Sequence, residues 1–342
     1  MYKTKQSSWI LVLFFSLGGI IGTILTMYLV YLTNIPEQTN TTDTDYSIRQ
    51  SGYAFINPLL ECEIQSKWER QKYIPFEYKT IERIKQEVIS THSGITLGVY
   101  VRNLNNGPWF GINEDTYYSP ASLMKLPVLI TYLKWIEMDP TIWDKKIQLE
   151  DDGLNTSQYY QPPRNLPTGK KYSVRELLEE MIVYSDNRSM VALMNAIPID
   201  IYVQINTDLG ITIPGIKTPE NYLSVKEVAT FFRIFYNASY LDRTSSEYAL
   251  ELLSRVTFDK WLRAWVPASV PISHKFGERG YTDDTSGKEI RQLHDCGIVY
   301  YGPYPYLVCV VTKGDDFDTD AQVIAATSRI IFEEISRAFP VK

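Results

Sequence analysis

An uncharged apolar segment near the N-terminus constrains the fold of this chain most strongly. Residues 9–32 are almost all apolar and contain no charged side chain. A helix of about 20 apolar residues is long enough to cross the hydrocarbon core of a membrane. The apolar region of a cleaved signal peptide is shorter, about 7 to 15 residues, and precedes a cleavage site of small residues. We therefore predict an uncleaved transmembrane anchor at 9–32 behind a short cytoplasmic tail at 1–8.

The basic residues around this segment predict its orientation. Lys3 and Lys5 precede the apolar run, and the next basic residue after it is Arg49. Basic residues near a transmembrane helix are enriched on the cytoplasmic side. We therefore expect a single-pass protein of the cell membrane, with a cytoplasmic N-terminus and an extracytoplasmic main domain.

The segment after the anchor is polar before it becomes apolar. The sequence TNIPEQTNTTDTDYSIR at 33–49 is rich in Thr and Asn and poor in aliphatic residues, which is typical of a flexible tether. Residues 53–64 are more apolar than a linker requires, and we suggest that they pack on the domain. We assign an extracytoplasmic linker to 33–66 and a folded domain to 67–342.

Composition excludes several classes of function. The chain has 342 residues, of which 44% are hydrophobic and 22% charged, a balance typical of a globular protein. The net charge of -6 comes without a basic block, so we expect no nucleic-acid partner. The three cysteines, Cys62, Cys296 and Cys309, match neither a metal-ligand spacing nor a dense disulfide framework. We expect buried free thiols.

The order of the periodic segments predicts the fold class. A helical pattern at 78–90 precedes an alternating strand pattern at 94–104 and a second strand of the same hairpin. Helical patterns then dominate, and short β-rich segments return only after residue 268, before a final amphipathic helix at 320–339. Such an order is typical of α+β proteins. We predict an antiparallel sheet built from N- and C-terminal strands, with a helical subdomain inserted between them.

Three short motifs carry candidate chemistry. Ser122 and Lys125 stand three residues apart at the start of an apolar helical run, so the amine can lie close enough to take the hydroxyl proton. Alone, this spacing more often means a capping serine and a solvated lysine. It is accompanied, however, by Ser185-Asp186-Asn187, directly after a helix predicted at 173–184, and by Lys275-Phe276-Gly277 in a predicted strand.

The order of the three motifs resembles that of class A β-lactamases and penicillin-binding proteins, from about Tyr78 to the C-terminus. The resemblance implies a β-lactamase/transpeptidase-like fold. It also implies that Ser122 is the nucleophile and that Lys125 is its base. That lysine must be neutral, a state that burial and a neighbouring Lys275 favour. Ser185 would relay a proton to the leaving nitrogen.

The same resemblance implies the substrate-binding residues. Asn187 would bind the acyl-side amide of the substrate, and the backbone N–H groups of Ser122 and Glu278 would hold the oxyanion. Gly277 would let the substrate lie against the strand backbone, and Lys275 suits a substrate that ends in a carboxylate. No metal or organic cofactor is implied.

Two departures from the family pattern bear on function. Phe276 stands where the family usually has Thr or Ser, so a hydroxyl for the substrate carboxylate is missing, and His274 or Arg279 are the candidates to replace it. The family's deacylating Glu, followed four residues later by Asn, has no match. The acidic residues between Ser-Asp-Asn and Lys-x-Gly include Asp200, Asp208, Glu220 and Glu227, with Gln204, Thr212, Ser224 and Phe231 four residues beyond them. Glu220 is the one candidate among them that we would test.

Without a positioned base, water should attack the acyl-enzyme slowly. We therefore predict a monomeric, membrane-anchored serine hydrolase that forms an acyl-enzyme on Ser122 with β-lactams or D-Ala-D-Ala-like peptides and deacylates slowly. One alternative is a genuine class A-like β-lactamase. Another is a catalytically weak cell-wall-binding or partner-binding module. A glutaminase on the same fold has the lowest weight, because we would expect it without an anchor.

Overall fold

The computed structural model describes residues 46–63, 76–105, 107–151, 158–215, 218–283 and 286–341. The predicted tail and anchor lie outside these ranges. Within them, none of the helices combines the length and apolar character that a membrane crossing requires.

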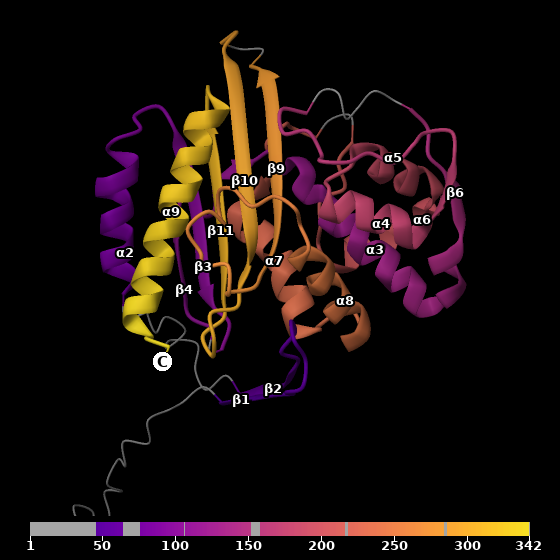
Figure 1. The fold of residues 1–342 in the computed structure, drawn as a ribbon, viewed down its shortest axis with the longest axis horizontal. Coiled ribbons are helices and arrows are strands. Elements are labelled where there is room, and N and C mark those ends of the chain that lie inside the picture. Colours follow the sequence, from indigo (N-terminus) through magenta and orange to yellow (C-terminus); the bar gives the residue numbers. More distant parts are fainter. Residues whose placement is uncertain are drawn as a thin grey trace, which may run out of the picture. The chain divides into compact units, whose positions relative to one another are not determined.

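A five-stranded antiparallel sheet forms the centre of the domain, in the order β4-β3-β11-β10-β9 (Figure 1). The N-terminal strand β3 pairs with β11 from the C-terminal part, from Tyr306 opposite Asn103 to Lys313 opposite Thr96. The prediction of an antiparallel sheet assembled from both ends of the domain is therefore confirmed. Its strands are β3 (Thr96–Asn103), β4 (Trp109–Ile112), β9 (Ile272–Thr282), β10 (Glu289–Val299) and β11 (Tyr306–Gly314).

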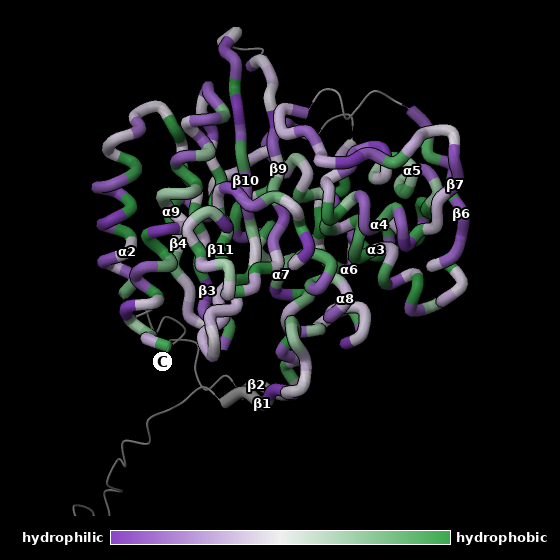
Figure 2. The backbone as a smooth tube through the Cα atoms, viewed as in Figure 1, coloured by the Kyte–Doolittle hydropathy of each residue, from purple (hydrophilic) through white to green (hydrophobic). Residues whose placement is uncertain are grey.

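Two helices from opposite ends of the chain lie together beside one face of the sheet (Figure 1). They are α2 (Glu77–Ile84), which continues as the π-helical turn η1 (Lys85–Ile89), and α9 (Phe317–Ala338). Hydrophobic and hydrophilic residues alternate along α2, so one side of the helix can be buried while the other meets solvent (Figure 2). Arg83 joins the two helices through Glu333 and Glu334 at 2.9 and 2.6 Å.

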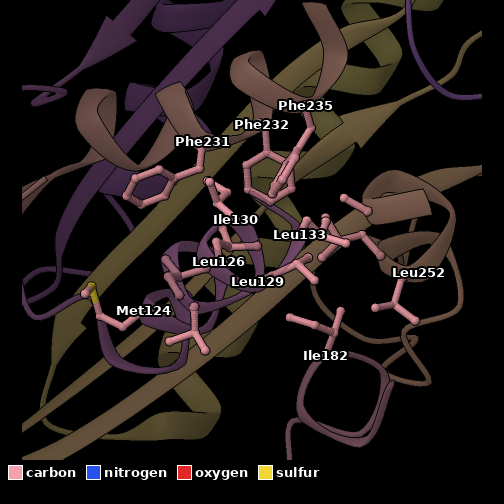
Figure 3. Close-up of a cluster of buried hydrophobic side chains, with 14 of the residues drawn as sticks. Met124, Leu126, Leu129, Ile130, Leu133, Ile182, Phe231, Phe232, Phe235 and Leu252 are labelled. Carbon is pink, nitrogen blue, oxygen red and sulfur yellow. The ribbon is translucent and has the colours of Figure 1, made fainter. Parts of the chain in front are cut away.

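The helical block lies in the chain between β4 and β9. Its most buried helix is α3, in which Leu126, Leu129, Ile130 and Leu133 are fully inaccessible (Figure 3). A helix that is apolar nearly all round must be surrounded by other elements, so α3 is a rigid support for its first residue, Lys125. The block comprises η2 (Ala121–Met124), α3 (Lys125–Met138), η3 (Pro140–Asp144), α4 (Val174–Val183), α5 (Asn187–Ala196), α6 (Ile199–Asp208), α7 (Val225–Asn237) and α8 (Arg243–Ser254).

Short strand pairs and side-chain caps fix the ends of these helices. Ser173 accepts a hydrogen bond from the backbone N–H of Glu176, and the Glu176 carboxylate accepts one from the N–H of Ser173. This capping box was predicted from the sequence and is confirmed. The short antiparallel pairs are β5 (Tyr117–Tyr118) with β8 (Leu223–Ser224), and β6 (Lys146–Gln148) with β7 (Lys171–Ser173).

Part of the predicted linker belongs to the folded domain. Strands β1 (Tyr46–Arg49) and β2 (Leu59–Glu63) pair antiparallel. Between them, the backbone N–H groups of residues 54–56 donate to the carboxylate of Glu247 on α8, at distances from 2.8 to 3.2 Å. The suggestion that residues 53–64 pack on the domain is thus confirmed for its described part. The compact unit of the structure begins at Tyr46, so it includes the described part of this segment.

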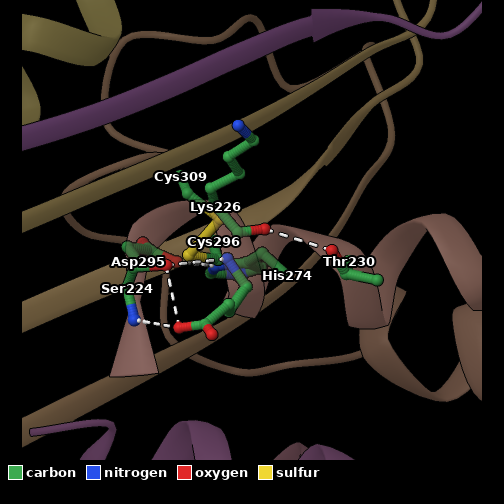
Figure 4. Close-up of a disulfide and its surroundings, with 8 residues drawn as sticks. Ser224, Lys226, Thr230, His274, Asp295, Cys296 and Cys309 are labelled. Atoms are coloured by element: carbon green, nitrogen blue, oxygen red, sulfur yellow. Dashed lines mark hydrogen bonds and ion pairs between the residues drawn. A yellow bond between two sulfur atoms is a disulfide. The ribbon is translucent and has the colours of Figure 1, made fainter. Parts of the chain in front are cut away.

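The cysteine prediction was wrong for two of the three residues. Cys296 on β10 and Cys309 on β11 face each other in the strand register, are fully buried and form a disulfide (Figure 4). The spacing of the cysteines in the sequence does not reveal this pairing, because it depends on the register of two strands. The disulfide joins the strand next to β9 to the middle strand of the sheet.

Candidate active site

Ser122 lies in a tight turn against the edge strand of the sheet. It belongs to the 3-10 turn η2, in which Ala121 has a left-handed backbone with φ 49°, and β9 is the edge strand beside it. A Cβ atom on Gly277 would lie 3.1 Å from the backbone N of Ser122 and 3.3 Å from the Cβ of Ala121. Gly277 therefore leaves room for the turn that carries the serine. The sequence interpretation had assigned that room to the substrate.

Lys125 extends from the first position of α3 into a cage of oxygen atoms. The lysine is fully buried, and its Nζ lies 3.2 Å from the Ser122 Oγ. It also donates to the carbonyl oxygen of Ser185 at 2.6 Å and to the Asn187 Oδ1 at 2.7 Å. The site thus brings together residues from the Ser-x-x-Lys and Ser-Asp-Asn motifs, which lie 60 positions apart in the chain.

Ser185 bridges the two lysines of the site. Its Oγ lies 3.0 Å from the Lys125 Nζ and 2.9 Å from the Lys275 Nζ. The backbone of Ser185 is left-handed, with φ 58°, a conformation that costs a non-glycine residue roughly 1–3 kcal/mol and that persists where surrounding contacts fix it. Asp186 contributes to that fixation, because its carboxylate accepts from the backbone N–H of Ser189 at 2.9 Å and caps α5.

Burial determines the charge of both lysines. Lys275 is fully buried, and its Nζ also donates to the carbonyl oxygen of Phe276 at 2.9 Å. Burial lowers the pKa of Lys275 to about 7. Burial, and then the nearby Lys275, hold the pKa of Lys125 well below its ordinary value. The lowered pKa favours the neutral form of the amine beside Ser122, which is the form that can accept a proton.

A cleft of about 890 Å³ runs past Ser122. Of the residues predicted for the site, Ser122, Asn187 and Glu278 line it. Across the described ranges, no group of three or more His, Cys, Asp and Glu residues is placed to hold a metal ion. The other lining residues are Gln158, Tyr159, Arg279, Gly280, Tyr281, Thr282, Glu289, Arg291, Asp315, Asp316 and Phe317.

The side chain of Glu278 has a place that sequence reasoning missed. Its two carboxylate oxygens accept hydrogen bonds from the backbone N–H groups of Tyr159 and Tyr160, at 2.6 and 3.0 Å. Burial raises the pKa of this carboxyl, while those bonds and the two lysines oppose the rise. Only its backbone N–H had been assigned a role. No sequence pattern links a strand residue to a loop more than a hundred positions earlier.

The residues considered for substrate-carboxylate recognition are all engaged elsewhere. Phe276 is buried and stacks on Phe258, with the ring centroids 4.2 Å apart. The His274 Nδ1 lies 2.9 Å from the Asp295 Oδ1, in a buried pair near the disulfide (Figure 4). Arg279 donates to both carboxylate oxygens of Glu220, at 2.6 and 3.1 Å.

The candidate deacylating carboxylates lie in other environments. Glu220 accepts from Arg279 and from the Ser119 Oγ, the latter at 3.0 Å, and lines a smaller pocket of about 280 Å³ beside Ala121. Burial alone would raise the pKa of Glu220, but the bonds from Arg279 and Ser119 keep it below its ordinary value. Glu227 caps α7. In the part of the chain that the structure describes, none of the four candidates hydrogen-bonds to Ser122 or Lys125.

Comparison with known proteins identifies the family and the fold of the chain. The sequence model described as the beta-lactamase enzyme family matches residues 79–335, which is most of the chain. A comparison with curated proteins finds no match to the sequence.

Solved structures share the fold at low sequence identity. The structure of PBP-A is 19% identical, has a TM-score of 0.64, and the match covers 78% of this chain and 98% of that one. A PBP-A variant in an acyl-enzyme complex with penicillin-G is 20% identical, with a TM-score of 0.62 and coverages of 77% and 100%. A beta-lactamase from Chitinophaga pinensis is 21% identical, with a TM-score of 0.63 and coverages of 75% and 99%.

Proposed function

The chain belongs to the beta-lactamase enzyme family, and from that premise we propose that it forms an acyl-enzyme on Ser122 with β-lactams or D-Ala-D-Ala-like peptides. One observation carries the proposal. The Lys125 Nζ lies 3.2 Å from the Ser122 Oγ, and Ser185 connects it to a second buried lysine, Lys275. A nucleophile, a base with a depressed pKa and a proton relay are what serine acyl transfer needs.

The acylation step follows from these positions. The neutral amine of Lys125 accepts the proton of Ser122 as the Oγ attacks the substrate carbonyl. The oxyanion accepts hydrogen bonds from the backbone N–H groups of Ser122 and Glu278. As the C–N bond breaks, Ser185 passes a proton from the lysine pair to the leaving nitrogen. Lys275 then replaces the proton that Ser185 has given up. A pKa of about 7 suits this amine, because it must both hold a proton and release it.

Asn187 orients the acyl side of the substrate in this proposal. Its Oδ1 is directed to the Lys125 Nζ at 2.7 Å, and the residue lines the cleft next to Ser122. The Asn187 Nδ2 is then the donor assigned to the acyl-side carbonyl. Asp186 acts only through position, because it caps the helix that Asn187 begins.

Slow deacylation is supported by the surroundings of the acidic residues. Hydrolysis of the ester needs a base that holds water on the carbonyl. Glu220, the one candidate from the sequence, is paired with Arg279 beside Ala121. We therefore place the protein with penicillin-binding enzymes in its kinetics, and an efficient β-lactamase is the alternative that the test below separates.

We further propose that residues 9–32 anchor the chain as a single membrane helix, with the catalytic domain outside the cell and acting as a monomer. The support is the uncharged apolar run and the two lysines before it. A tethered domain outside the membrane can reach peptidoglycan-type peptides. Protease added to intact cells should cleave the domain. A domain that is cleaved only after the cells are lysed would contradict this orientation.

Intact-mass spectrometry tests the acylation proposal. The detergent-solubilised full chain is mixed with benzylpenicillin and followed for hours beside Ser122→Ala. We expect a lasting adduct of the mass of the drug that the variant lacks. Loss of the drug without an adduct would show an efficient β-lactamase. An intact drug without an adduct would favour a wall-binding or partner-binding module.

A further inference from the structure

The backbone of Ser119, three residues before the nucleophile, is held by two side chains of strand β10. The Ser119 N–H donates to the Gln292 Oε1 at 3.0 Å, and the Ser119 carbonyl oxygen lies 2.6 Å from the His294 Nε2. All three residues are buried, and neither Gln292 nor His294 has any exposed surface. Both polar backbone groups of one residue are thus bound by side chains that follow it by 173 and 175 positions.

The chemistry of these two contacts fixes the state of both side chains. A carbonyl oxygen can only accept, so the His294 Nε2 carries the hydrogen. Burial lowers the pKa of His294 to about 4, so the imidazole is neutral at neutral pH. The amide of Gln292 is also oriented, because its Nε2 donates to the Asn221 Oδ1 at 2.8 Å and its Oε1 is left to accept from Ser119. Each side chain therefore presents the group that the Ser119 backbone requires.

The strand register explains why Gln292 and His294 reach the same turn. They stand two residues apart on β10, so their side chains lie on one face of the sheet. His294 is directly opposite Gly277 on β9, and the residue between the two side chains is opposite Glu278. The backbone at Gly277 passes so close to η2 that an added Cβ would lie 3.1 Å from the N of Ser122. Strand β10 therefore holds the turn beside the part of β9 that carries Glu278.

The two N–H groups assigned to the oxyanion lie on the two segments that β10 joins. The Ser122 N–H belongs to η2, and the Glu278 N–H belongs to β9. Both donors must point at one oxygen, and a displacement of about 1 Å can slow a reaction by about 100-fold. Within the turn, Ala121 is left-handed and the Leu123 N–H donates to the Pro120 carbonyl oxygen at 3.0 Å. That internal bond does not fix the distance to β9, which therefore depends on contacts from outside the turn.

We propose that Gln292 and His294 are positioning residues for acylation, which set the distance between the two oxyanion donors by holding Ser119. The proposal rests on the proposed function, because it takes acylation of Ser122 as given. Neither side chain is among the residues that line the cleft, so both act through the turn and not on the substrate. Burial of an amide and an imidazole is unfavourable unless each is hydrogen-bonded, and the Ser119 backbone supplies one bond to each.

Acylation kinetics of His294→Leu test the proposal on the detergent-solubilised full chain. Adduct formation at several benzylpenicillin concentrations gives a dissociation constant for the first complex and a rate constant for acylation. The oxyanion bonds strengthen only as the Ser122 Oγ attacks, so the dissociation constant should change by less than about threefold. We expect the rate constant to fall by about 10- to 100-fold. A rate constant within about twofold of that of the parent chain would overturn the proposal.

Two further variants separate the hydrogen bonds from packing. His294→Gln keeps an N–H donor of similar reach, so its rate constant should lie within about fivefold of that of the parent chain. Gln292→Met has a side chain of similar length but offers no oxygen to the Ser119 N–H, so it should slow acylation as His294→Leu does. Equal rate constants in His294→Gln and His294→Leu would contradict the proposal, because the bond to Ser119 would then have no effect.

Thr312→Val is the matched control for loss of stability. Thr312 on β11 is fully buried, and its Oγ1 donates to the Leu293 carbonyl oxygen at 3.2 Å. The variant removes a buried hydrogen bond to the same part of β10 but leaves both contacts of Ser119. It should lower the midpoint of thermal unfolding and keep the acylation rate constant within about twofold of that of the parent chain. If it slowed acylation as much as His294→Leu, loss of stability would explain both effects and the proposal would be overturned.

Hydrogen exchange separates failure of this proposal from failure of the proposed function. If the parent chain neither forms an adduct with benzylpenicillin nor consumes it, the proposed function is overturned. Exchange in a peptide that spans residues 117–124 then tests whether β10 holds the turn. Faster exchange in Gln292→Met and His294→Leu than in the parent chain and Thr312→Val would uphold the hold on Ser119. Equal exchange in all four chains would overturn it.

Discussion

The two walls of the cleft differ in how their polar groups are paired. On the wall of η2, α3 and α5, the groups of Ser122, Lys125 and Ser185 contact one another and a second lysine, within 3.2 Å. On the wall of β9 beyond Gly277, charged groups pair with protein carboxylates or with backbone amides. The first wall is arranged for bond making, whereas the second neutralises its own charges. The difference teaches that this chain brings its motif residues into contact on one wall, while the charged groups of β9 beyond Gly277 are engaged by the protein itself.

The largest effect should come from the first wall. Lys125→Ala removes the base, so acylation by benzylpenicillin should slow by about 10³-fold. Lys125→Arg keeps a cation but offers no neutral amine, so it should be equally slow. Rates from intact-mass time courses check both variants. A Lys125→Arg variant with near-normal rates would mean that the residue acts by charge and not as a base.

A substitution on the second wall should affect stability more than recognition. Phe276→Thr restores the hydroxyl of the family pattern, but it leaves a cavity beside Phe258 and Trp261. We expect it to lower the free energy of unfolding by about 3 kcal/mol and not to accelerate acylation by benzylpenicillin. Denaturant unfolding and intact-mass time courses check the two parts. Faster acylation would show that position 276 faces the substrate.

The buried lysine between the walls should make stability depend on pH. The pKa of Lys275 is about 7 in the folded protein and about 10.4 when unfolded. Between these values the unfolded chain binds more protons, so the contribution of Lys275 to stability rises with pH, by about 1 kcal/mol per unit. Stability is lost as pH falls toward 7. Denaturant unfolding of Lys275→Met between pH 7.5 and 9.5 should lack the part of the pH dependence of stability that Lys275 contributes. An unchanged dependence on pH would contradict the depressed pKa of Lys275.

The smallest effect should come from a contact distant from both walls. Glu247→Gln replaces the carboxylate that binds the N–H groups of residues 54–56 with a neutral amide, which is a weaker acceptor. We expect the free energy of unfolding to fall by about 1 kcal/mol and hydrogen exchange at these amides to become faster. The acylation rate should stay within twofold of that of the parent chain. If acylation changed as much as in Lys125→Ala, the contact between residues 54–56 and Glu247 would have to act on the site.

The reach of the sequence can be judged from particular residues. The periodic pattern placed the β3 strand and the α4 helix, and the Ser173 and Glu176 spacing identified its cap, because these signals are local. Ser122 and Lys125 could be paired because one helical turn separates them. Cys296 and Cys309 could not, since their contact depends on strand register.

The sequence by itself determined the three motifs, the α+β order of elements and the apolar N-terminal run, because each is set by spacing along the chain. Only the tertiary structure decided how those motifs meet, with Ser185 between two lysines. It also decided that Phe276 turns into an aromatic cluster, that Arg279 binds Glu220, and that Glu278 holds a loop. The physical reason is that charge pairing and burial depend on distances between remote segments, and folding alone sets those distances.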